Sequence, residues 1–259
     1  MSLHPDFLTR PLAHRAWHDR AAGRPENSRA AVRAAVAAGY GIEIDLQVSA
    51  DGVAMVFHDD DLDRLTGATG PVRARTAAEL GAIGLTDAGD GIPTLAEVLD
   101  IVAGQVPLLI ELKDQSGVMG PEMAGLPEAT AAALQGYGGP VAVMSFNPHA
   151  VGQMAQAAPH VPRGITSYDW PADHFPDLPG VAAYRDRLLA IADYDAVGAC
   201  FVSHLWRDLA RPRVADLKAQ GAAILCWTIK DPAQEAEARK IAQNITFEGY
   251  AAAFHGAGP

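Results

Sequence analysis

The chain has no apolar run that approaches the roughly 20 residues needed to cross a membrane. Its first residues, Met1 to Phe7, also lack the basic segment and the long apolar stretch of a signal peptide. Mean hydropathy is close to zero, at +0.04, as in ordinary globular proteins. We therefore expect no transmembrane segment and a cytoplasmic location.

Cysteine is also scarce, with only two in 259 residues. Cys200 and Cys226 both lie inside apolar runs, which predicts two reduced thiols in the core rather than a disulfide. A zinc site would need more ligands at closer spacing than this sequence offers.

Positive charge is in short supply, because 20 Lys and Arg stand against 31 Asp and Glu and give a formal net charge of −11. This balance argues against nucleic acid, whose phosphates are bound through many basic side chains. Lys113 is the only lysine in the first 217 residues, and it directly follows an apolar stretch. An anionic small molecule would therefore need positive charge supplied locally, and Lys113 is a candidate.

Apolar runs of strand length alternate with Ala-rich helical stretches, and no repeat or linker divides the chain, so we expect one domain over residues 1–259. This rhythm favours a parallel barrel or a doubly wound sheet. The expected strands are 12–15, 41–47, 107–113, 141–146, 164–167, 199–203, 223–228 and 244–248. The expected helices are 28–38, 95–103, 129–134, 149–157, 212–220 and 232–242.

One further apolar run, residues 53–58, breaks this rhythm. The connection from the preceding strand is too short for a parallel crossover, and Asp51-Gly52 is a hairpin turn signal. We therefore expect an antiparallel return arm that brings His58 back to the end of the second strand. Residues 59–92 then form a long insertion, with a short helix near 76–80, at one side of the site.

Two acidic residues alternate with apolar ones in Gly41-Ile-Glu-Ile-Asp-Leu-Gln, so Glu43 and Asp45 share one face of a strand. In a barrel this face points inward, where two uncompensated carboxylates would repel each other and lose solvation. A cation between them would resolve the conflict. The alternative for this pair alone is an exposed edge strand with a solvated acidic face.

A second strand repeats the pattern, because Pro107-Leu-Leu-Ile-Glu-Leu-Lys places Glu111 and Lys113 on one face. Two strands that both end in inward charged groups are hard to explain as ordinary solvent-exposed residues. Glu43, Asp45 and Glu111 together offer hard oxygen ligands, which suit Mg²⁺ or Ca²⁺. The sequence therefore predicts one divalent cation as cofactor.

Two histidines also fall at strand ends, His14 after the first strand and His58 after the hairpin arm. A single histidine at a strand end is usually structural, but a pair beside a carboxylate site suits general acid–base catalysis near neutral pH. The remaining histidines look like loop or helix residues, and they are His4, His18, His149, His160, His174, His204 and His255.

These residues carry a resemblance to the glycerophosphodiester phosphodiesterase family. The matching motifs stand in the family's order across residues 12–113. They are His14-Arg15, Pro25-Glu26-Asn27, Glu43-Ile-Asp45, Asp51-Gly52, His58-Asp59, Arg64-x-Thr66, Pro93-Thr94-Leu95 and Glu111-Leu-Lys113. Beyond residue 113 only Ser145-Phe146 and Trp227-Thr228 resemble the later strand ends.

The resemblance implies a TIM-type (β/α)8 barrel and a phosphoric diester hydrolase acting on glycerophosphodiesters. It implies a metal on the three carboxylates, His14 and His58 as acid–base pair, and Arg15 and Lys113 as phosphate-binding cations. We expect the diester to pass through a cyclic phosphate, with Ser145, Phe146 and Trp227 as a wall against the substrate. No sequence feature indicates an oligomeric state.

Three positions depart from the family's usual pattern. Ala16 stands where the family usually has Gly, Lys230 where it has Asn, and Glu248 where the last strand usually ends in Thr-Asp. These departures bear on substrate identity more than on reaction class. Two alternatives stay open, a metal-dependent aldolase or lyase on the same barrel and a non-catalytic phosphodiester-binding protein.

Overall fold

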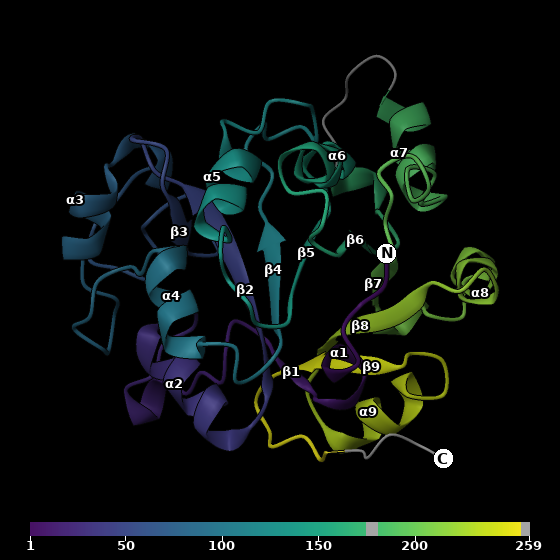
Figure 1. Ribbon diagram of the computed structural model, residues 1–259, viewed down its shortest axis with the longest axis horizontal. Helices are drawn as coiled ribbons and strands as arrows, with labels where there is room; N and C mark the ends of the chain where they lie inside the picture. The colour runs from purple at the N-terminus through teal and green to yellow at the C-terminus, as the bar shows by residue number, and fades with distance from the viewer. Residues whose placement is uncertain (175–180, 255–259) are drawn as a thin grey trace.

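The computed structural model describes residues 1–174 and 181–254 (Figure 1). Eight parallel strands form a closed barrel, because β1 pairs with both β2 and β9. This closure confirms the expected TIM-type barrel and excludes the doubly wound sheet. The barrel strands are β1 (Leu12–Ala13), β2 (Gly41–Val48), β4 (Leu108–Leu112), β5 (Val141–Ser145), β6 (Arg163–Ser167), β7 (Phe201–Leu205), β8 (Ala223–Ile229) and β9 (Asn244–Phe247).

Helices follow the barrel strands and cover the outside of the barrel (Figure 1). The six expected helices form, with ends that differ by a few residues, but α1 and α7 were not expected from the sequence. The helices outside the insertion are α1 (Asp6–Thr9), α2 (Arg29–Ala38), α4 (Leu95–Val102), α5 (Leu126–Ala133), α6 (Pro148–Ala157), α7 (Val181–Leu189), α8 (Pro212–Ala219) and α9 (Pro232–Ala238). Short 3-10 turns lie at Arg20–Ala22, Val72–Ala74, Ala172–His174 and Trp206–Asp208.

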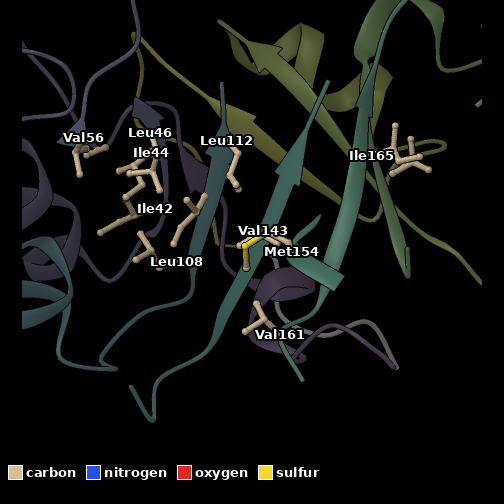
Figure 2. Close-up of a cluster of buried hydrophobic side chains, with 14 of the residues drawn as sticks. Ile42, Ile44, Leu46, Val56, Leu108, Leu112, Val143, Met154, Val161 and Ile165 are labelled. Carbon is tan, nitrogen blue, oxygen red and sulfur yellow. The ribbon is translucent and has the colours of Figure 1, made fainter. Parts of the chain in front are cut away.

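The layer between strands and helices is apolar. Ile42, Ile44 and Leu46 of β2 are fully buried on the helix-facing side, together with Leu108 and Val143 from the next strands (Figure 2). Since successive residues of a strand point to opposite faces, Glu43 and Asp45 must face the barrel interior. The edge-strand alternative for this acidic pair is therefore excluded.

The barrel interior is also apolar at the end where the strands begin. Phe7 of α1 and Leu12, Leu109, Phe201 and Leu225 of the strands form a separate buried cluster there. Packing is tight enough that a Cβ at position 164 would lie 2.4 Å from the ring of Phe201, which explains the glycine. Charged groups are left to the opposite end, where the strands finish.

The expected hairpin is present, since β3 (Ala54–Val56) pairs antiparallel with β2 and Val56 lies opposite Leu46. The segment after β3 contains α3 (Ala77–Ala82) and packs around its own small core at one side of the barrel (left in Figure 1). The amide of Phe57 donates to the carbonyl of Asp45 at 3.0 Å, which returns His58 to the end of β2.

The structure bears on the expected absence of a transmembrane segment and on the two cysteines. Within residues 1–174 and 181–254, no helix combines the length and the apolar character that a membrane crossing requires. Cys200 and Cys226 are free thiols, and Cys226 is completely buried. The cytoplasmic location stays a prediction.

Candidate active site at the barrel mouth

A cavity of about 470 Å³ opens where the barrel strands end; we call it the central cavity. Its position matches that of active sites in (β/α)8 barrels, which lie at the carboxyl ends of the strands. It brings together residues from seven of the eight barrel strands and their following loops. The charged and histidine side chains that line it are His14, Arg15, His18, Glu26, Glu43, His58, Glu111, Lys113, Lys230 and Glu248.

The three expected carboxylates converge at this cavity: Glu43 and Glu111 line it, and Asp45 lies beside them. Parallel register places Asp45 directly beside Glu111, and Glu43 lies one inward position below Asp45 on β2. One oxygen from each of the three lies within 4.8 Å of the other two. All three side chains are buried, so they form a single site that we call the acidic triad.

Lys113 neutralises part of the acidic triad. Its Nζ lies 2.7 Å from Oδ1 of Asp45 and 2.6 Å from Oε1 of Glu111. Burial would raise the pKa of Asp45, but Lys113, His58 and Arg15 together hold it below its ordinary value. The side chain of Lys113 also lines the cavity. The ammonium that forms these ion pairs is therefore the same group that is expected to contact phosphate.

Glu43 shows that one lysine does not compensate three carboxylates. Burial raises the pKa of Glu43 well above its ordinary value, and the charges of Asp45 and Glu111 raise it further. Its Oε2 accepts a hydrogen bond from the amide of Arg15 at 2.9 Å, which offsets only part of this effect. A second cation beside Lys113 would allow all three to ionise, so the residues present fit a divalent ion with oxygen ligands.

Arg15 approaches the triad from the loop after β1. Its Nε lies 3.7 Å from Oδ2 of Asp45, and its Nη1 donates to Oε1 of Glu26 at 2.7 Å. Asn27 donates from Nδ2 to the same Asp45 oxygen at 2.9 Å. Asp45 is therefore held from three sides, which fixes its carboxylate for ligation.

Ala16 follows Arg15 in a left-handed conformation, with φ of 64°. This conformation favours glycine, and an alanine there costs about 1 kcal/mol. The amide of Ala16 donates to the carbonyl of Glu43 at 2.9 Å and holds the turn against β2. The departure at position 16 therefore adds a methyl group and leaves the chemical groups of the site in place.

His58 is oriented by a chain of charged contacts. Its Nδ1 lies 2.7 Å from Oδ1 of Asp59, and Arg64 donates to both oxygens of Asp59 at 2.6 and 2.8 Å. Arg64 also donates to Glu26, the partner of Arg15. Burial lowers the pKa of His58, and the charge of Lys113 lowers it further against the opposing charge of Asp45.

His14, which follows β1, is also oriented by a carboxylate. Its Nδ1 lies 2.7 Å from Oε2 of Glu248, whose Oε1 lies 2.8 Å from Nζ of Lys230. Burial lowers the pKa of His14, while the hydrogen bond with Glu248 opposes that change. In both histidines the carboxylate contact uses Nδ1, so Nε2 is the ring nitrogen left for chemistry in the cavity.

Two of the three residues expected to form a wall against the substrate line the cavity. Phe146 and Trp227 line the cavity, with their ring centroids 5.3 Å apart and edge to face. Ser145 does not line it, because its hydroxyl is buried, donates to the carbonyl of Leu112 at 2.6 Å and accepts from the amide of Asn147. The position of Ser145 therefore fits a structural role at the end of β5.

His204 differs from its expected place in a loop or helix, because it lies within β7 and is 1% exposed. Its Nδ1 lies 2.7 Å from Oγ of Ser167 and its Nε2 lies 3.1 Å from Oδ2 of Asp208. The contacts Ser167–His204–Asp208 resemble those of an activated serine nucleophile, but neither Ser167 nor His204 lines the central cavity. We interpret the contacts as a satisfied buried histidine.

The fold and this site define a class of protein: a TIM barrel whose mouth brings together an acidic triad that could hold a metal ion, cationic side chains and two oriented histidines. The glycerophosphoryl diester phosphodiesterase family model matches residues 14–245. The chain belongs to this family of phosphoric diester hydrolases, which confirms the family and enzyme class expected from the sequence.

Individual relatives agree with this assignment. A glycerophosphodiester phosphodiesterase of Caldanaerobacter subterraneus subsp. tengcongensis is 33% identical over 150 residues, which cover 54% of this chain and 60% of that relative. A glycerophosphodiester phosphodiesterase of Bacillus altitudinis is 27% identical over 186 residues, or 66% and 71% of the two chains. The chain thus spans less than two thirds of the length of the first relative.

Solved structures show the same fold over nearly the whole chain. An Oleispira antarctica phosphodiesterase in complex with its product sn-glycerol-3-phosphate superposes with a TM-score of 0.75 at 24% identity and covers 93% of each chain. A Thermotoga maritima glycerophosphodiester phosphodiesterase gives 0.67 at 21% identity, covering 91% and 92%.

Proposed function

We propose that this protein hydrolyses glycerophosphodiesters to glycerol phosphate and an alcohol in the central cavity. The observation that carries the proposal is that two histidines, each held at Nδ1 by a carboxylate, share one cavity with Arg15, Lys113 and two carboxylates of the acidic triad. Anion-binding cations, a cation site and an acid–base pair are the groups that cleavage of a phosphodiester requires. A non-catalytic binding protein would not need the two oriented histidines.

Glu43, Asp45 and Glu111 would hold one divalent cation, Mg²⁺ or Ca²⁺, because carboxylate oxygens without His or Cys are the ligands these ions prefer. When bound, such an ion neutralises negative charge on a phosphoryl oxygen. Arg15 and Lys113 bind the remaining phosphoryl oxygens and orient the diester. Asn27 and the amide of Arg15 keep two of the ligand carboxylates in place.

His14 and His58 move the protons. One neutral imidazole takes the proton of the attacking hydroxyl while a new phosphorus–oxygen bond forms. The other, protonated, donates from Nε2 to the departing alkoxide as the ester bond to the alcohol breaks. Glu248 and Asp59 keep each Nδ1 engaged, which fixes the ring orientations and directs Nε2 to the substrate.

The nucleophile of the first step is the 2-hydroxyl of the substrate's own glycerol. This hydroxyl is held next to the phosphorus by covalent bonds, which gives it an entropic advantage over free water. Attack releases the alcohol and leaves a five-membered cyclic phosphate. Water then opens the ring in the reverse sense, with the two histidines exchanging roles, to give glycerol phosphate.

The test compares two diesters with the same leaving alcohol, one with the 2-hydroxyl and one in which hydrogen replaces it. The proposal predicts that the deoxy diester binds as an inhibitor and is turned over at least about 10³-fold more slowly. Comparable turnover of the two would make water the nucleophile and remove the cyclic phosphate from the mechanism.

A further inference from the structure

A second cavity of about 610 Å³ adjoins the central cavity; we call it the side cavity. The two cavities share five lining residues, so they form one continuous space around the reacting centre. The shared residues are His58, Glu111, Lys113, Phe146 and Trp227. A diester whose phosphorus lies between His58 and Lys113 can therefore place one of its two arms in the side cavity.

Four aromatic rings form one wall of the side cavity, and we call them the aromatic cluster. Phe146 and Tyr168 directly follow β5 and β6, Trp170 lies in the loop after β6, and Trp227 lies in β8. Phe146 meets the other three rings edge to face, at centroid distances of 5.3 to 5.9 Å. Aromatic rings carry negative potential on their faces, so rings that line a cavity can attract a cation there.

Acidic residues also line the side cavity. Asp59, Asp60 and Asp114 line it, and Asp59 is compensated by Arg64 and His58. Asp60 and Asp114 make no ion pair with any residue in the described part of the chain. Their side chains accept hydrogen bonds from amides and hydroxyls, such as Nε2 of Gln47 at 2.9 Å from Asp60.

Lys113 is the one lysine or arginine among the described residues that line the side cavity, and two arginines lie near them: Arg73, and Arg185, whose Nε donates to the carbonyl of Trp170. Lys113 reaches the side cavity, but its ammonium is within 2.7 Å of both Asp45 and Glu111. Arg73 lies in a neighbouring depression with Asp60 and Asp114 and donates to the carbonyl of Gln115 instead. The side cavity therefore combines aromatic faces with net negative charge.

We propose that the side cavity binds the leaving alcohol of the substrate and selects an alkylated ammonium, as in choline, over uncharged polyols. Aromatic faces with a carboxylate nearby are the recognised arrangement for quaternary ammonium ions. In a choline diester the nitrogen lies only two carbon atoms beyond the ester oxygen, so it falls in the adjoining space. The charge distribution fits a zwitterion, with anion-binding groups in the central cavity and carboxylates in the side cavity.

The inference rests on the proposed function, and its first test keeps the two apart. Purified protein is assayed on glycerophosphocholine, on its neutral 3,3-dimethylbutyl isostere and on glycerophosphoglycerol. The proposal predicts a kcat/KM for glycerophosphocholine at least about tenfold above those of both neutral substrates. Equal values for glycerophosphocholine and its isostere would overturn the ammonium selectivity while leaving the proposed hydrolysis intact.

A binding test works without turnover. Tetramethylammonium is titrated against tryptophan fluorescence, with tert-butanol as a neutral ligand of similar shape. We expect tetramethylammonium to bind at least about tenfold more tightly than tert-butanol. Protein that hydrolyses none of the diesters but shows this difference would contradict the proposed function and not the ammonium site; equal binding would contradict the site.

Matched variants locate the site. Tyr168→Leu removes a ring face and lowers the preference for the ammonium several-fold, whereas Tyr168→Phe retains the ring and the preference. Asp60→Asn keeps the shape of the side chain and lowers the preference by removing one charge. If Tyr168→Leu and Tyr168→Phe behave alike in the tetramethylammonium titration, the aromatic cluster does not bind the ammonium.

Discussion

The ammonium of Lys230 lies 2.8 Å from Oε1 of Glu248, and the two residues follow the neighbouring strands β8 and β9. The second oxygen of the same carboxylate lies 2.7 Å from Nδ1 of His14. Both positions depart from the residues usual in the family. The structure shows that these departures form one ion pair, which orients a histidine of the cavity.

Glu248 is therefore expected to act through His14. Glu248→Gln keeps the shape of the side chain but removes the charge that stabilises the imidazolium and selects the tautomer with hydrogen on Nδ1. We expect kcat to fall by about 10²-fold with little change in KM, and the pH profile of kcat/KM to change on the limb that reports His14. Steady-state kinetics between pH 5 and 9 measures both effects.

Lys230→Asn tests the outer half of this pair. The lysine is largely exposed, so its contact with Glu248 contributes little, and we expect kcat to fall by less than tenfold. In the Glu248→Gln background the same substitution should have no further effect, because the two act as a unit. Lys240→Asn, at a lysine of similar exposure paired with Glu237, is the control. Full additivity of Lys230→Asn and Glu248→Gln would contradict the coupling.

Much of the site could be predicted from local pattern. Strict alternation placed Glu43 and Asp45 on the inward face of β2, and Glu111 and Lys113 on that of β4, because side-chain direction in a strand follows directly from position. The hairpin was predictable for the same reason, since a short connection with Asp51-Gly52 excludes a parallel crossover.

Contacts between distant loops could not be predicted. His14 and Glu248 are 234 positions apart; a closed barrel brings its first and last strands together, but nothing in the sequence shows that these two side chains meet. Tyr168 and Trp170 lie in a connection without hydrophobic periodicity, so the aromatic cluster was missed. Helix α7 was missed because its apolar residues form only a weak face. His204 looked like a loop residue because the strand containing it lies two residues later than expected.

Binding of a divalent cation to the acidic triad should stabilise the protein. Millimolar Mg²⁺ or Ca²⁺ should raise the Tm of EDTA-treated protein, since a ligand that binds only the folded state shifts unfolding by mass action. Glu43→Gln should remove most of this shift, because it replaces a buried carboxylate of the triad. Glu97→Gln, at an exposed carboxylate paired with Arg29, is the control. A Tm shift equal in Glu43→Gln and wild type would place the ion elsewhere.

Lys113 should affect both catalysis and stability. Lys113→Met should lower kcat/KM by about 10²-fold, or roughly 2.7 kcal/mol, through loss of a phosphate contact. It should also lower the free energy of unfolding of the metal-free protein by about 3–5 kcal/mol, since Asp45 and Glu111 lose their shared cation. Urea denaturation with and without Mg²⁺ measures the second effect. Lys218→Met is the control, and unchanged kinetics would leave Lys113 with the ion-pairing role alone.

The pH dependence follows from the direction of the histidine shifts. Burial lowers the pKa of His14 and of His58 from the ordinary 6.5, so the histidine that acts as base stays neutral below that pH. The profile of kcat/KM should be bell-shaped, because activity is lost at low pH when the base is protonated and at high pH when the acid loses its proton. The lowered pKa of the base places the acidic limb below pH 6.5. Replacing either histidine by Ala should lower kcat by about 10²–10⁴-fold. An acidic limb above pH 6.5 would contradict this account.

The most direct test of the central claim is release of glycerol phosphate from a glycerophosphodiester by purified protein, followed by an enzyme-coupled assay. The account predicts turnover with Mg²⁺ or Ca²⁺, loss of at least about 10³-fold in EDTA, recovery when the ion is restored, and no recovery in His58→Ala. Absence of glycerol phosphate from every diester, or an equal rate in EDTA, would contradict cation-dependent hydrolysis at this site.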